Sequence, residues 1–548
     1  MPVTLSYPGV YIEELPSGTH TITGVATSIA AFIGWAAQGP ANQATLVQSW
    51  SDFANQFGGL DARSYLGYAV NQFFGNGGQQ AYIVRLTSGA SPASITITGL
   101  DLYSVPVYPL TSPPTLSYVG SITTSLTKGV AGLVLTAANP GGWGNNYAVS
   151  IQPTPNQGTP NITRFSLSVL YIDPTGQAKP VAVESFPNLS LDSNDPRYVV
   201  NIINEQSHLV TAAINGAGLT ITNDPTKPAT AYVQLQGGGP GTVLAPATTK
   251  DSPGAFEMAL NLDGLSGDTG VHYLDKVPIF NLLCVPGEID PTTISELQAY
   301  CVSKHAFLIV DSQSTDTFVS LQNGPDSRIT GSNSINAAFY FPWVNVFDPV
   351  LNFTRSFPPC GFIAGLYAAT DASRGVWKTP AGIDVSLTGE AGLTTPLTDA
   401  QNGTLNLQAI NCLRNFRVYG DVVWGGRTLR GNDQVGSEWK YIPIRRLALF
   451  LEVSLYEGTQ WVVFEPNDEP LWGQIRLNIG AFMQGLFLQG AFQGTTPQKA
   501  YFVKCDSENN PQSSIDRGIV NILVGFAPLY PAEFVVIQIQ QKAGQTQA

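Results

Sequence analysis

The chain has few charged side chains and no cluster of basic residues. Asp, Glu, Lys and Arg make up 12% of its 548 residues, against about 25% in an average soluble protein. Its net charge is −13, and no group of Lys and Arg is interleaved with aromatic residues. Because nucleic-acid binding depends on neutralising phosphates, we expect no nucleic-acid partner. The neutral surface suits a subunit packed against copies of itself, but also an extracellular β protein rich in Ser, Thr and Gly.

Cysteine is scarce as well, and its placement bears on the cellular compartment. The cysteines are scattered and odd in number, with no CxxC pair, which predicts reduced, mostly buried thiols in a protein folded in the cytosol. They are Cys284, Cys301, Cys360, Cys412 and Cys505. No basic stretch followed by an apolar core opens the chain, so no secretory signal is predicted. We expect a protein that is cytoplasmic in the producing cell and that leaves it, if at all, by lysis.

Long apolar runs and cofactor motifs are also absent. The apolar stretch from Ile29 to Ala37 is too short to span a bilayer, so we expect no direct membrane insertion. The sequence contains no GxxxxGK[ST] phosphate loop and no His, Cys, Asp or Glu cluster with metal-ligand spacing. It therefore predicts neither a cofactor nor a metal site.

The first part of the chain predicts α/β structure. Short helices are expected at Ser51–Phe57 and Tyr65–Gly75, and the run AYIVRL, Ala81–Leu86, has the composition of a strand.

The composition then changes over residues 88–250, which are rich in Ser, Thr, Pro, Gly and Asn. Short β-branched runs such as ASITITGL and FSLSVLYID predict a β-rich domain inserted in a surface loop. A disordered linker is the weaker alternative, because Trp143 and other aromatic residues supply a core. The motif NPGGWGNN, 139–146, is consistent with a tight loop capped by Trp143 and equally with a role in an interface. The run GGGPG, 237–241, predicts a flexible connector at the end of the insertion.

From residue 251 onward, apolar strands alternate with helices. VPIFNLLCVP and AFLIVD predict buried strands, with helices at Pro291–Lys304 and Pro359–Asp371. Such alternation favours an α/β fold with a largely parallel sheet covered on both faces.

The last third predicts three helices and two strands. The helices are expected at Thr404–Val418, from Pro443 to Gly458, and after an N-cap at Asn467. The strands are expected in DVVWGGRTL and in TQWVVFE, Thr459–Glu465.

The third of these helices carries apolar residues on more than one side. Its main stripe consists of Trp472, Ile475, Ile479, Phe482 and Leu486. Away from that stripe lie Leu471, Leu477, Phe487 and Phe492. This distribution predicts a second packing partner, either another subunit or a different protein.

An α/β fold of this kind raises the possibility of a subtilisin-type hydrolase, which needs Asp, His and Ser to converge. His305 and Asp311 stand at opposite ends of one predicted strand, so their Cα atoms lie about 20 Å apart. A catalytic triad is therefore not expected, and Asp311 and Ser312 are interpreted as a helix cap or turn after a strand.

Both termini contain short extended segments that lack an obvious partner within the chain. Val10–Glu13 follows Tyr7, Pro8 and Gly9, while Phe534–Gln540 alternates apolar and polar residues after Pro528 and Pro531. Open strand edges of this kind normally promote association with other chains.

The motifs YPGVYIEE, QWVVFEPNDEPLW, YFVKCD and PAEFVV resemble those of the sheath proteins of contractile phage tails and bacterial contractile injection systems. The resemblance covers residues 5–87 and about 270–542. It implies a subtilisin-like α/β core interrupted by an outer domain, with terminal arms that exchange strands between subunits. The implied divisions are 1–20 (N-terminal arm), 21–87 (first part of the core), 88–250 (inserted β-rich outer domain), 251–400 (subtilisin-like α/β domain), 401–530 (C-terminal core domain) and 531–548 (C-terminal arm).

The resemblance further implies a subunit that polymerises helically around an inner tube and contracts to drive that tube through a target envelope. Partners would be further copies of the chain, the tube protein, and baseplate and terminal cap proteins. Residues for strand exchange would be Val10, Tyr11, Ile12, Glu13, Phe534, Val535, Val536, Ile537 and Ile539. Candidates for tube contact are Arg445, Arg446 and Arg476. The alternatives are an active subtilisin-like hydrolase and a non-contractile structural protein or adhesin.

Overall fold

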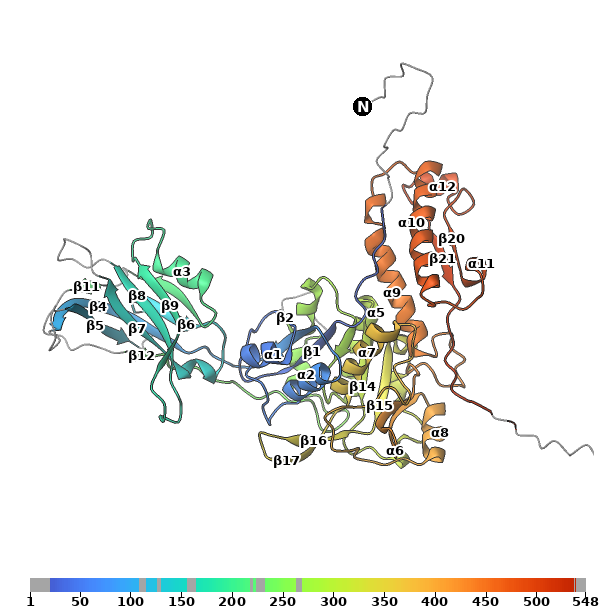
Figure 1. Ribbon diagram of the computed structural model, residues 1–548, viewed down its shortest axis with the longest axis horizontal. Helices are drawn as coiled ribbons and strands as arrows, with labels where there is room; N and C mark the ends of the chain where they lie inside the picture. Colours follow the sequence, from blue (N-terminus) through green and yellow to red (C-terminus); the bar gives the residue numbers. More distant parts are fainter. Residues whose placement is uncertain are drawn as a thin grey trace, which may run out of the picture.

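The structure is a computed structural model that describes residues 20–107, 115–125, 130–154, 164–216, 220–222, 232–262, 269–536 and 538. A β-rich lobe lies at one end, a central α/β body in the middle, and a largely helical part beside the body (Figure 1). Val10–Glu13, Ile537 and Ile539 of the predicted arms lie outside the described residues.

The central body is built on one eight-stranded sheet. Its strands, in spatial order, are β19 (Gly420–Trp424), β18 (Ile410–Phe416), β15 (Ala337–Phe341), β14 (Phe307–Asp311), β13 (Leu282–Cys284), β1 (Ala30–Trp35), β3 (Ala81–Leu86) and β2 (Ala44–Val47). All neighbouring pairs are parallel except the two at the edges. The prediction of a largely parallel sheet is confirmed.

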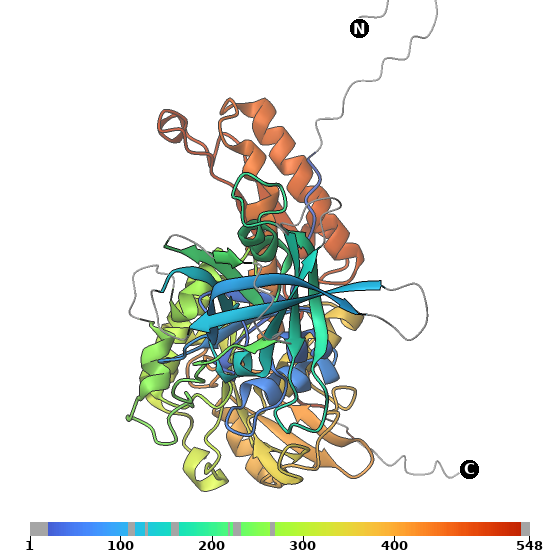
Figure 2. The same cartoon turned by 90° about the vertical axis from the view of Figure 1, so that its left-hand side faces the viewer.

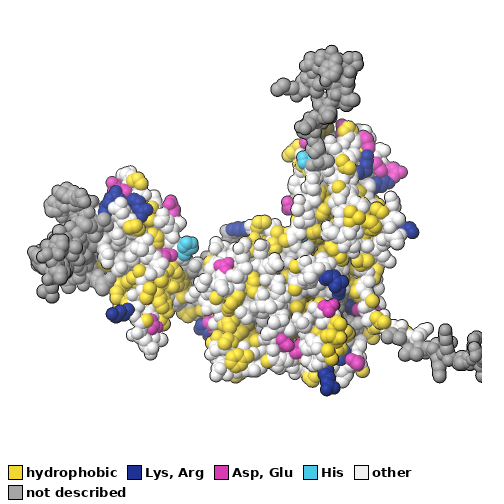
Figure 3. All heavy atoms as spheres, viewed as in Figure 1, with side chains coloured by type: hydrophobic (Ala, Val, Ile, Leu, Met, Phe, Trp, Pro, Cys, Tyr) yellow, Lys and Arg dark blue, Asp and Glu magenta, His cyan; other side chains and the backbone are white. Residues whose placement is uncertain are grey.

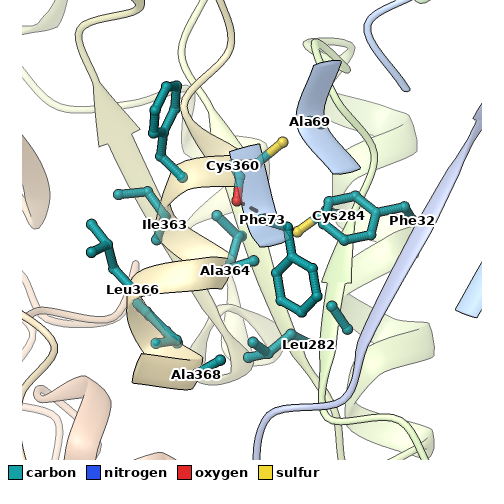
Figure 4. Packing of buried hydrophobic residues seen from close by; sticks show 14 of the residues in the cluster. Phe32, Ala69, Phe73, Leu282, Cys284, Cys360, Ile363, Ala364, Leu366 and Ala368 are labelled. Carbon is teal, nitrogen blue, oxygen red and sulfur yellow. Dashed lines mark hydrogen bonds between the residues drawn. The ribbon is translucent and has the colours of Figure 1, made fainter. Parts of the chain in front are cut away.

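Helices cover both faces of this sheet because its strands are apolar on both sides. Alternate residues of β1 point in opposite directions, so Phe32 and Ile33 belong to different buried clusters. One face is covered by α1 (Trp50–Phe57), α2 (Leu66–Gly75) and α7 (Cys360–Arg374), and the other by α4 (Ala255–Leu260), α5 (Pro291–Ser303) and α8 (Asp399–Leu407). Figure 4 shows the first cluster, where Phe32 and Phe73 pack beside Cys284 and Cys360. All five cysteines are free and buried, as predicted.

The β lobe has its own core. One sheet contains β4 (Ser94–Val107), β5 (Thr115–Ser125), β6 (Gly132–Ala137), β10 (Val210–Asn215) and β11 (Thr220–Thr222). The other contains β7 (Tyr147–Thr154), β8 (Arg164–Tyr171), β9 (Val181–Leu189) and β12 (Val233–Gln234), and α3 (Val199–Gln206) packs beside them. The buried cluster runs from Ala93 to Leu235 without a residue of the central body. In Figure 2 the lobe faces the viewer, in front of the body. Its described residues form a folded unit, not a disordered linker.

The C-terminal part pairs two long helices with a small hairpin. It contains α9 (Ile442–Gly458), α10 (Glu469–Leu488), α11 (Pro497–Ala500), β20 (Tyr501–Lys504), α12 (Gln512–Ile515) and β21 (Leu523–Phe526). Pro443 stands at the start of α9, as predicted, because proline is tolerated in the first helical turn. The cap of α10 is Asp468, whose carboxylate accepts from the N–H of Leu471, and not Asn467. Asn467 instead accepts a hydrogen bond from the indole of Trp472.

Two predicted elements are wrong. The expected helix Thr404–Val418 is the end of α8 followed by β18, which pairs with β15 through Ile410–Cys412. Apolar residues three positions apart fit the helical pattern. Hydrogen bonds to the neighbouring strand β15, however, stabilise a strand here instead of a helix. The expected strand TQWVVFE contains only the 3₁₀ turn Gln460–Val462. No strand pairs with it in the described structure, and Phe464 is fully exposed at 102%.

The predicted second partner of α10 is partly the chain itself. Leu471 and Phe492 are buried in the same cluster as the main stripe, and Phe487 packs against that cluster. Only Leu477 of the four off-stripe residues remains exposed, at 60%.

Asp311 ties two loops together at the carboxyl end of β14. Its buried carboxylate accepts hydrogen bonds from the N–H groups of Gly287 (3.0 Å) and Cys360 (2.9 Å). Burial raises the pKa of Asp311 to about 6, although these two N–H groups oppose the shift. The residue therefore caps a helix, but that helix is α7, which begins 49 residues later. Ser312 follows in the loop, and its carbonyl accepts from the indole of Trp343.

Replacing Asp311 tests the structural role of these two hydrogen bonds. In Asp311→Ala two buried N–H groups lose their acceptor, so we expect the free energy of unfolding to fall by about 2–4 kcal/mol. Urea denaturation should show a lower midpoint with an unchanged slope. Asp399→Ala is the control, because that side chain is 93% exposed. Equal midpoints for the two variants would contradict the structural role of Asp311.

Candidate functional site: the terminal segments and their anchors

The C-terminal segment is held to the body at Glu533. Both carboxylate oxygens accept from the guanidinium of Arg427, each at 2.6 Å, and Oε2 also accepts from the hydroxyl of Tyr441 at 3.1 Å. The side chain of Arg427 is completely buried and also pairs with Asp433. Such a bidentate ion pair fixes the orientation of the carboxylate as well as its position. It marks the last strong attachment of the described chain.

The pKa of Glu533 reflects this environment. Burial alone raises the pKa of the carboxyl, but the hydrogen bonds and charge of Arg427 outweigh burial and lower it from 4.5. The pKa of Arg427 is raised for the complementary reason: burial lowers it, and Glu533 more than reverses the effect. Both groups are therefore charged at neutral pH.

Beyond this anchor the chain exposes three apolar side chains in succession. Phe534, Val535 and Val536 are 73%, 81% and 81% exposed, and the backbone there forms neither helix nor strand. Before the anchor, Tyr530 packs edge-on against Tyr441, with ring centroids 6.2 Å apart. Residues 529–534 border a cleft of about 1100 Å³ whose opposite wall includes Trp377 and Trp424.

The N-terminal segment runs along α9. Ile22 is buried in the C-terminal cluster, the apolar core formed around Trp472 and Ile479 of α10. The N–H of Val25 donates to the hydroxyl of Ser454 at 3.2 Å. His20 stacks on Trp461 with ring centroids 4.3 Å apart. Gly458 makes room for this path, since a Cβ there would lie 2.6 Å from Ile22. The described chain thus starts at the end of α9 that is remote from the central sheet (Figure 1).

The hairpin of β20 and β21 leaves two strand edges open. The two strands pair only with each other in the described structure, in register Tyr501–Phe526 to Lys504–Leu523. One face packs on α10 through the C-terminal cluster. Phe502 and Leu523 remain 53% and 52% exposed. Neither outer edge of this small sheet is paired with a further strand of the described residues.

Two of the three arginines predicted to contact a tube are engaged inside the chain. Arg445 donates to Asn336 at 2.6 Å and pairs with Glu452. Arg446 makes a bidentate ion pair with Asp371, at 2.6 and 2.9 Å. Arg445 is 7% exposed and Arg446 is 3% exposed. Arg476 differs, since a third of its side chain is exposed beside Glu469.

Exposed apolar side chains also occur away from the termini. The hairpin of β16 (Val344–Asp348) and β17 (Phe353–Phe357) exposes Phe347, Val350, Leu351 and Phe353 by 44–53%. Charged side chains are sparse on the face shown in Figure 3, and apolar ones gather in several patches. Surfaces of this kind favour association between protein chains.

The histidines show no catalytic grouping. In the described structure His208, His272 and His305 pair with Glu184, Asp275 and Glu452, and none of them contacts Asp311. No three His, Cys, Asp or Glu side chains among the described residues are arranged to hold a metal ion. Among these residues no helix has both the length and the apolarity needed to cross a membrane.

One further acidic group lies near the carboxyl ends of the strands. Glu288 is 3% exposed, and its Oε1 accepts from the N–H of Asp290 at 2.7 Å. Burial raises its pKa to about 8, and the nearby charges of Glu257 and Asp290 act in the same direction. The carboxyl is therefore mainly neutral at pH 7.

Comparisons with known proteins match two regions of the chain to known domains. The phage tail sheath protein central domain matches residues 271–429, and the phage tail sheath C-terminal domain matches residues 434–542. A tail sheath protein of Vibrio phage KVP40 is 28% identical over 35% of this chain and 27% of its own length. A prophage major tail sheath protein of Pseudomonas aeruginosa is 28% identical over 35% of this chain and 48% of its own length. The chain thus spans about half or less of these curated relatives. Both matching domains are those of phage tail sheath proteins.

Solved structures share the fold over nearly the whole chain. The helical sheath of the anti-feeding prophage in its contracted state matches with a TM-score of 0.56 at 22% identity, covering 98% of this chain and 100% of that one. The PVC sheath complex of an extracellular contractile injection system, also contracted, matches with a TM-score of 0.54 at 21% identity over 99% of each chain. A sheath tail protein of Listeria innocua matches with a TM-score of 0.57 at 12% identity over 93% and 97%.

The anchor at Glu533 can be tested by proteolysis. In Glu533→Ala the C-terminal segment loses its charged attachment, so chymotrypsin should cleave after Phe534 about tenfold faster than in the wild type. Glu465→Ala, which changes an exposed carboxylate in another loop, is the control. Unchanged cleavage in Glu533→Ala would show that other contacts hold the segment.

Glu288 predicts a pH dependence of stability. The folded-state pKa of Glu288, about 8, lies above its ordinary value of 4.5. Its contribution to the free energy of unfolding is therefore largest below pH 4.5. That contribution declines as the pH rises and levels off above about 8. Between pH 5 and 8 the wild type should lose on the order of 2–4 kcal/mol more stability than Glu288→Gln. Urea denaturation at both pH values measures this difference. Glu469→Gln should show the same change of stability with pH as the wild type. If Glu288→Gln also shows that change, Glu288 is not its cause.

Proposed function

We propose that the chain is the subunit of a contractile sheath, which polymerises helically around an inner tube and contracts to drive that tube through a target envelope. The observation that carries the proposal is the end of the folded body: Glu533 is clamped, and the apolar residues that follow it have no partner within the described chain. The matches to two phage tail sheath domains and the likeness of the fold to contracted sheaths support it.

Strand exchange between subunits gives these segments a partner. We propose that Phe534, Val535, Val536, Ile537 and Ile539 of one subunit, and Val10, Tyr11, Ile12 and Glu13 of another, add strands to a neighbouring sheet. The hairpin of β20 and β21 is the acceptor that this chain offers, because its two edges are open and its exposed residues are apolar. Addition of a strand to an open edge supplies main-chain hydrogen bonds without a deep pocket. Contacts that do not close on themselves propagate as a helical polymer.

The mechanism needs no nucleotide or cofactor. A body that is linked to its neighbours by strand exchange at both ends can rotate and repack while those links persist. Energy would come from the difference between two packed arrangements of the subunits, and a small difference per subunit is multiplied along the polymer. The inner tube, baseplate and terminal cap are the further partners in this proposal. For the tube contact, Arg476 remains the candidate with an accessible side chain.

The division of the chain follows the same proposal. Residues 88–250 would form the outer domain, while residues 21–87 and 251–400 would share a subtilisin-like α/β core without its catalytic residues. Residues 401–530 would form the C-terminal core domain that carries the acceptor hairpin, and 1–20 and 531–548 the two arms. An active hydrolase is disfavoured by the arrangement of the histidines.

Truncation of the C-terminal arm tests the proposal. The wild-type chain, expressed alone or with a candidate tube protein, should form striated hollow cylinders in negative-stain electron microscopy. Removal of residues 532–548 should leave folded protein that does not assemble, whereas removal of residues 541–548 retains the exchange residues and should still allow assembly. Normal cylinders after the longer truncation would refute strand exchange through this arm.

A further inference from the structure

Arg85 is a buried cation without an acidic partner. It lies near the end of β3, is 2% exposed, and forms no ion pair with any described residue. Burial lowers the pKa of its guanidinium to about 10, and no neighbouring charge opposes the shift. A buried charge of this kind is unfavourable unless polar groups replace the lost water. The structure shows which groups do so.

Four backbone carbonyls surround the guanidinium. Nε donates to the carbonyl of Ala36 (2.9 Å), Nη2 to Ala37 (3.2 Å), and Nη1 to both Gly39 (2.6 Å) and Pro140 (2.9 Å). The first three acceptors belong to the loop after β1 in the central body. Pro140 belongs to the NPGGWGNN loop of the β lobe. A single charged group is therefore shared between the two bodies.

The NPGGWGNN loop also binds the two linkers that join the lobe to the body. The N–H of Gly141 donates to Ser91 in the incoming linker at 3.1 Å. The side-chain amide of Asn145 donates to the carbonyl of Gly238 at 2.8 Å and accepts from its N–H at 3.0 Å. Gly238 lies in the GGGPG run of the outgoing linker. The prediction that this run is a flexible connector is wrong, because its backbone is hydrogen-bonded.

The two linkers are hydrogen-bonded to each other as well. Ser91 and Gly239 exchange two bonds of 2.9 and 3.1 Å, and the N–H of Thr242 donates to Ser88 at 2.9 Å. The backbones approach so closely that Gly241, with φ of +68°, has no space for a Cβ beside Ser88. Gly141, with φ of +146°, lies against the carbonyl of Ala37 in the same way, at 2.7 Å from an added Cβ. Close backbone contacts therefore occur both between the two linkers and between the NPGGWGNN loop and the central body.

We propose that Arg85 and the NPGGWGNN loop form a rigid coupling, which holds the β lobe in one orientation on the central body so that the two turn as a unit. Tilting the lobe would pull Pro140 away and leave a buried guanidinium N–H without an acceptor. The coupling goes beyond the proposed sheath function and does not depend on it, because all its contacts lie within one chain. Any structure carried by the lobe would keep a fixed direction relative to the body.

A distance measurement between the two bodies tests the coupling. Cysteines replacing Val181 in the lobe and Val319 in the body, which are 59% and 69% exposed, can carry spin labels, since all five native cysteines are buried. Dilution of the labelled full-length chain into unlabelled chain keeps the signal intramolecular. Wild type should give one narrow distance distribution, and Arg85→Met should broaden it about twofold or more. Arg197→Met is the matched control, because that arginine binds a carbonyl within the lobe only.

A second variant separates coupling from folding. Asn145→Ala leaves Arg85 intact and removes the clamp on Gly238, so it should also broaden the distribution while the circular dichroism stays that of the wild type. If Arg85→Met fails to fold, Asn145→Ala decides the question. The proposal is overturned if the wild-type distribution is already broad, or if the folded variants keep its narrow width.

Discussion

Burial of both faces of the parallel sheet is the constraint on which the rest of the molecule depends. β1 lies between β3 and β13, so strands from the first hundred residues and from beyond residue 280 must meet in one layer. Between β3 and β13 the chain first forms the β lobe, whose buried residues from Ala93 to Leu235 have their own core, and then α4, which returns to the central sheet. The two linkers of the lobe lie side by side, where Ser91 and Gly239 hydrogen-bond.

Several arginines are used in the interior. Arg446 and Asp371 are each 3% exposed at the side chain and join α9 to α7. Arg427 holds Glu533 at the end of the folded body, and Arg85 joins the body to the lobe. Buried ion pairs cost desolvation, so their net contribution to stability is modest, but their geometry is exacting. They fix how parts of the chain are placed relative to one another.

The surface has the opposite character. Low charge density, the exposed apolar hairpin of β16 and β17, and the open edges of β20 and β21 would each favour uncontrolled association in a solitary protein. In a subunit of an ordered polymer these same groups are the contacts. A body with firmly fixed internal placement and exposed apolar residues at 534–536 suits the proposed sheath subunit, which needs no catalytic group.

The sequence by itself determined the elements whose signals are local. AYIVRL is β3 at its predicted bounds, Pro291 begins α5, and the Ser/Thr-rich middle is a β lobe. The family, and through it the proposed function, also followed from local motifs near the C-terminus. Tertiary structure decided whatever depends on partners distant in the chain. Ile410 to Phe416 became a strand because β15 lies beside it, and Arg445 and Arg446 turned inward because Asn336 and Asp371 lie within reach. The guanidinium of Arg85 meets Pro140 for the same reason: hydrogen bonds and ion pairs form between groups that folding brings together, and a periodic pattern records only which face of a segment is apolar.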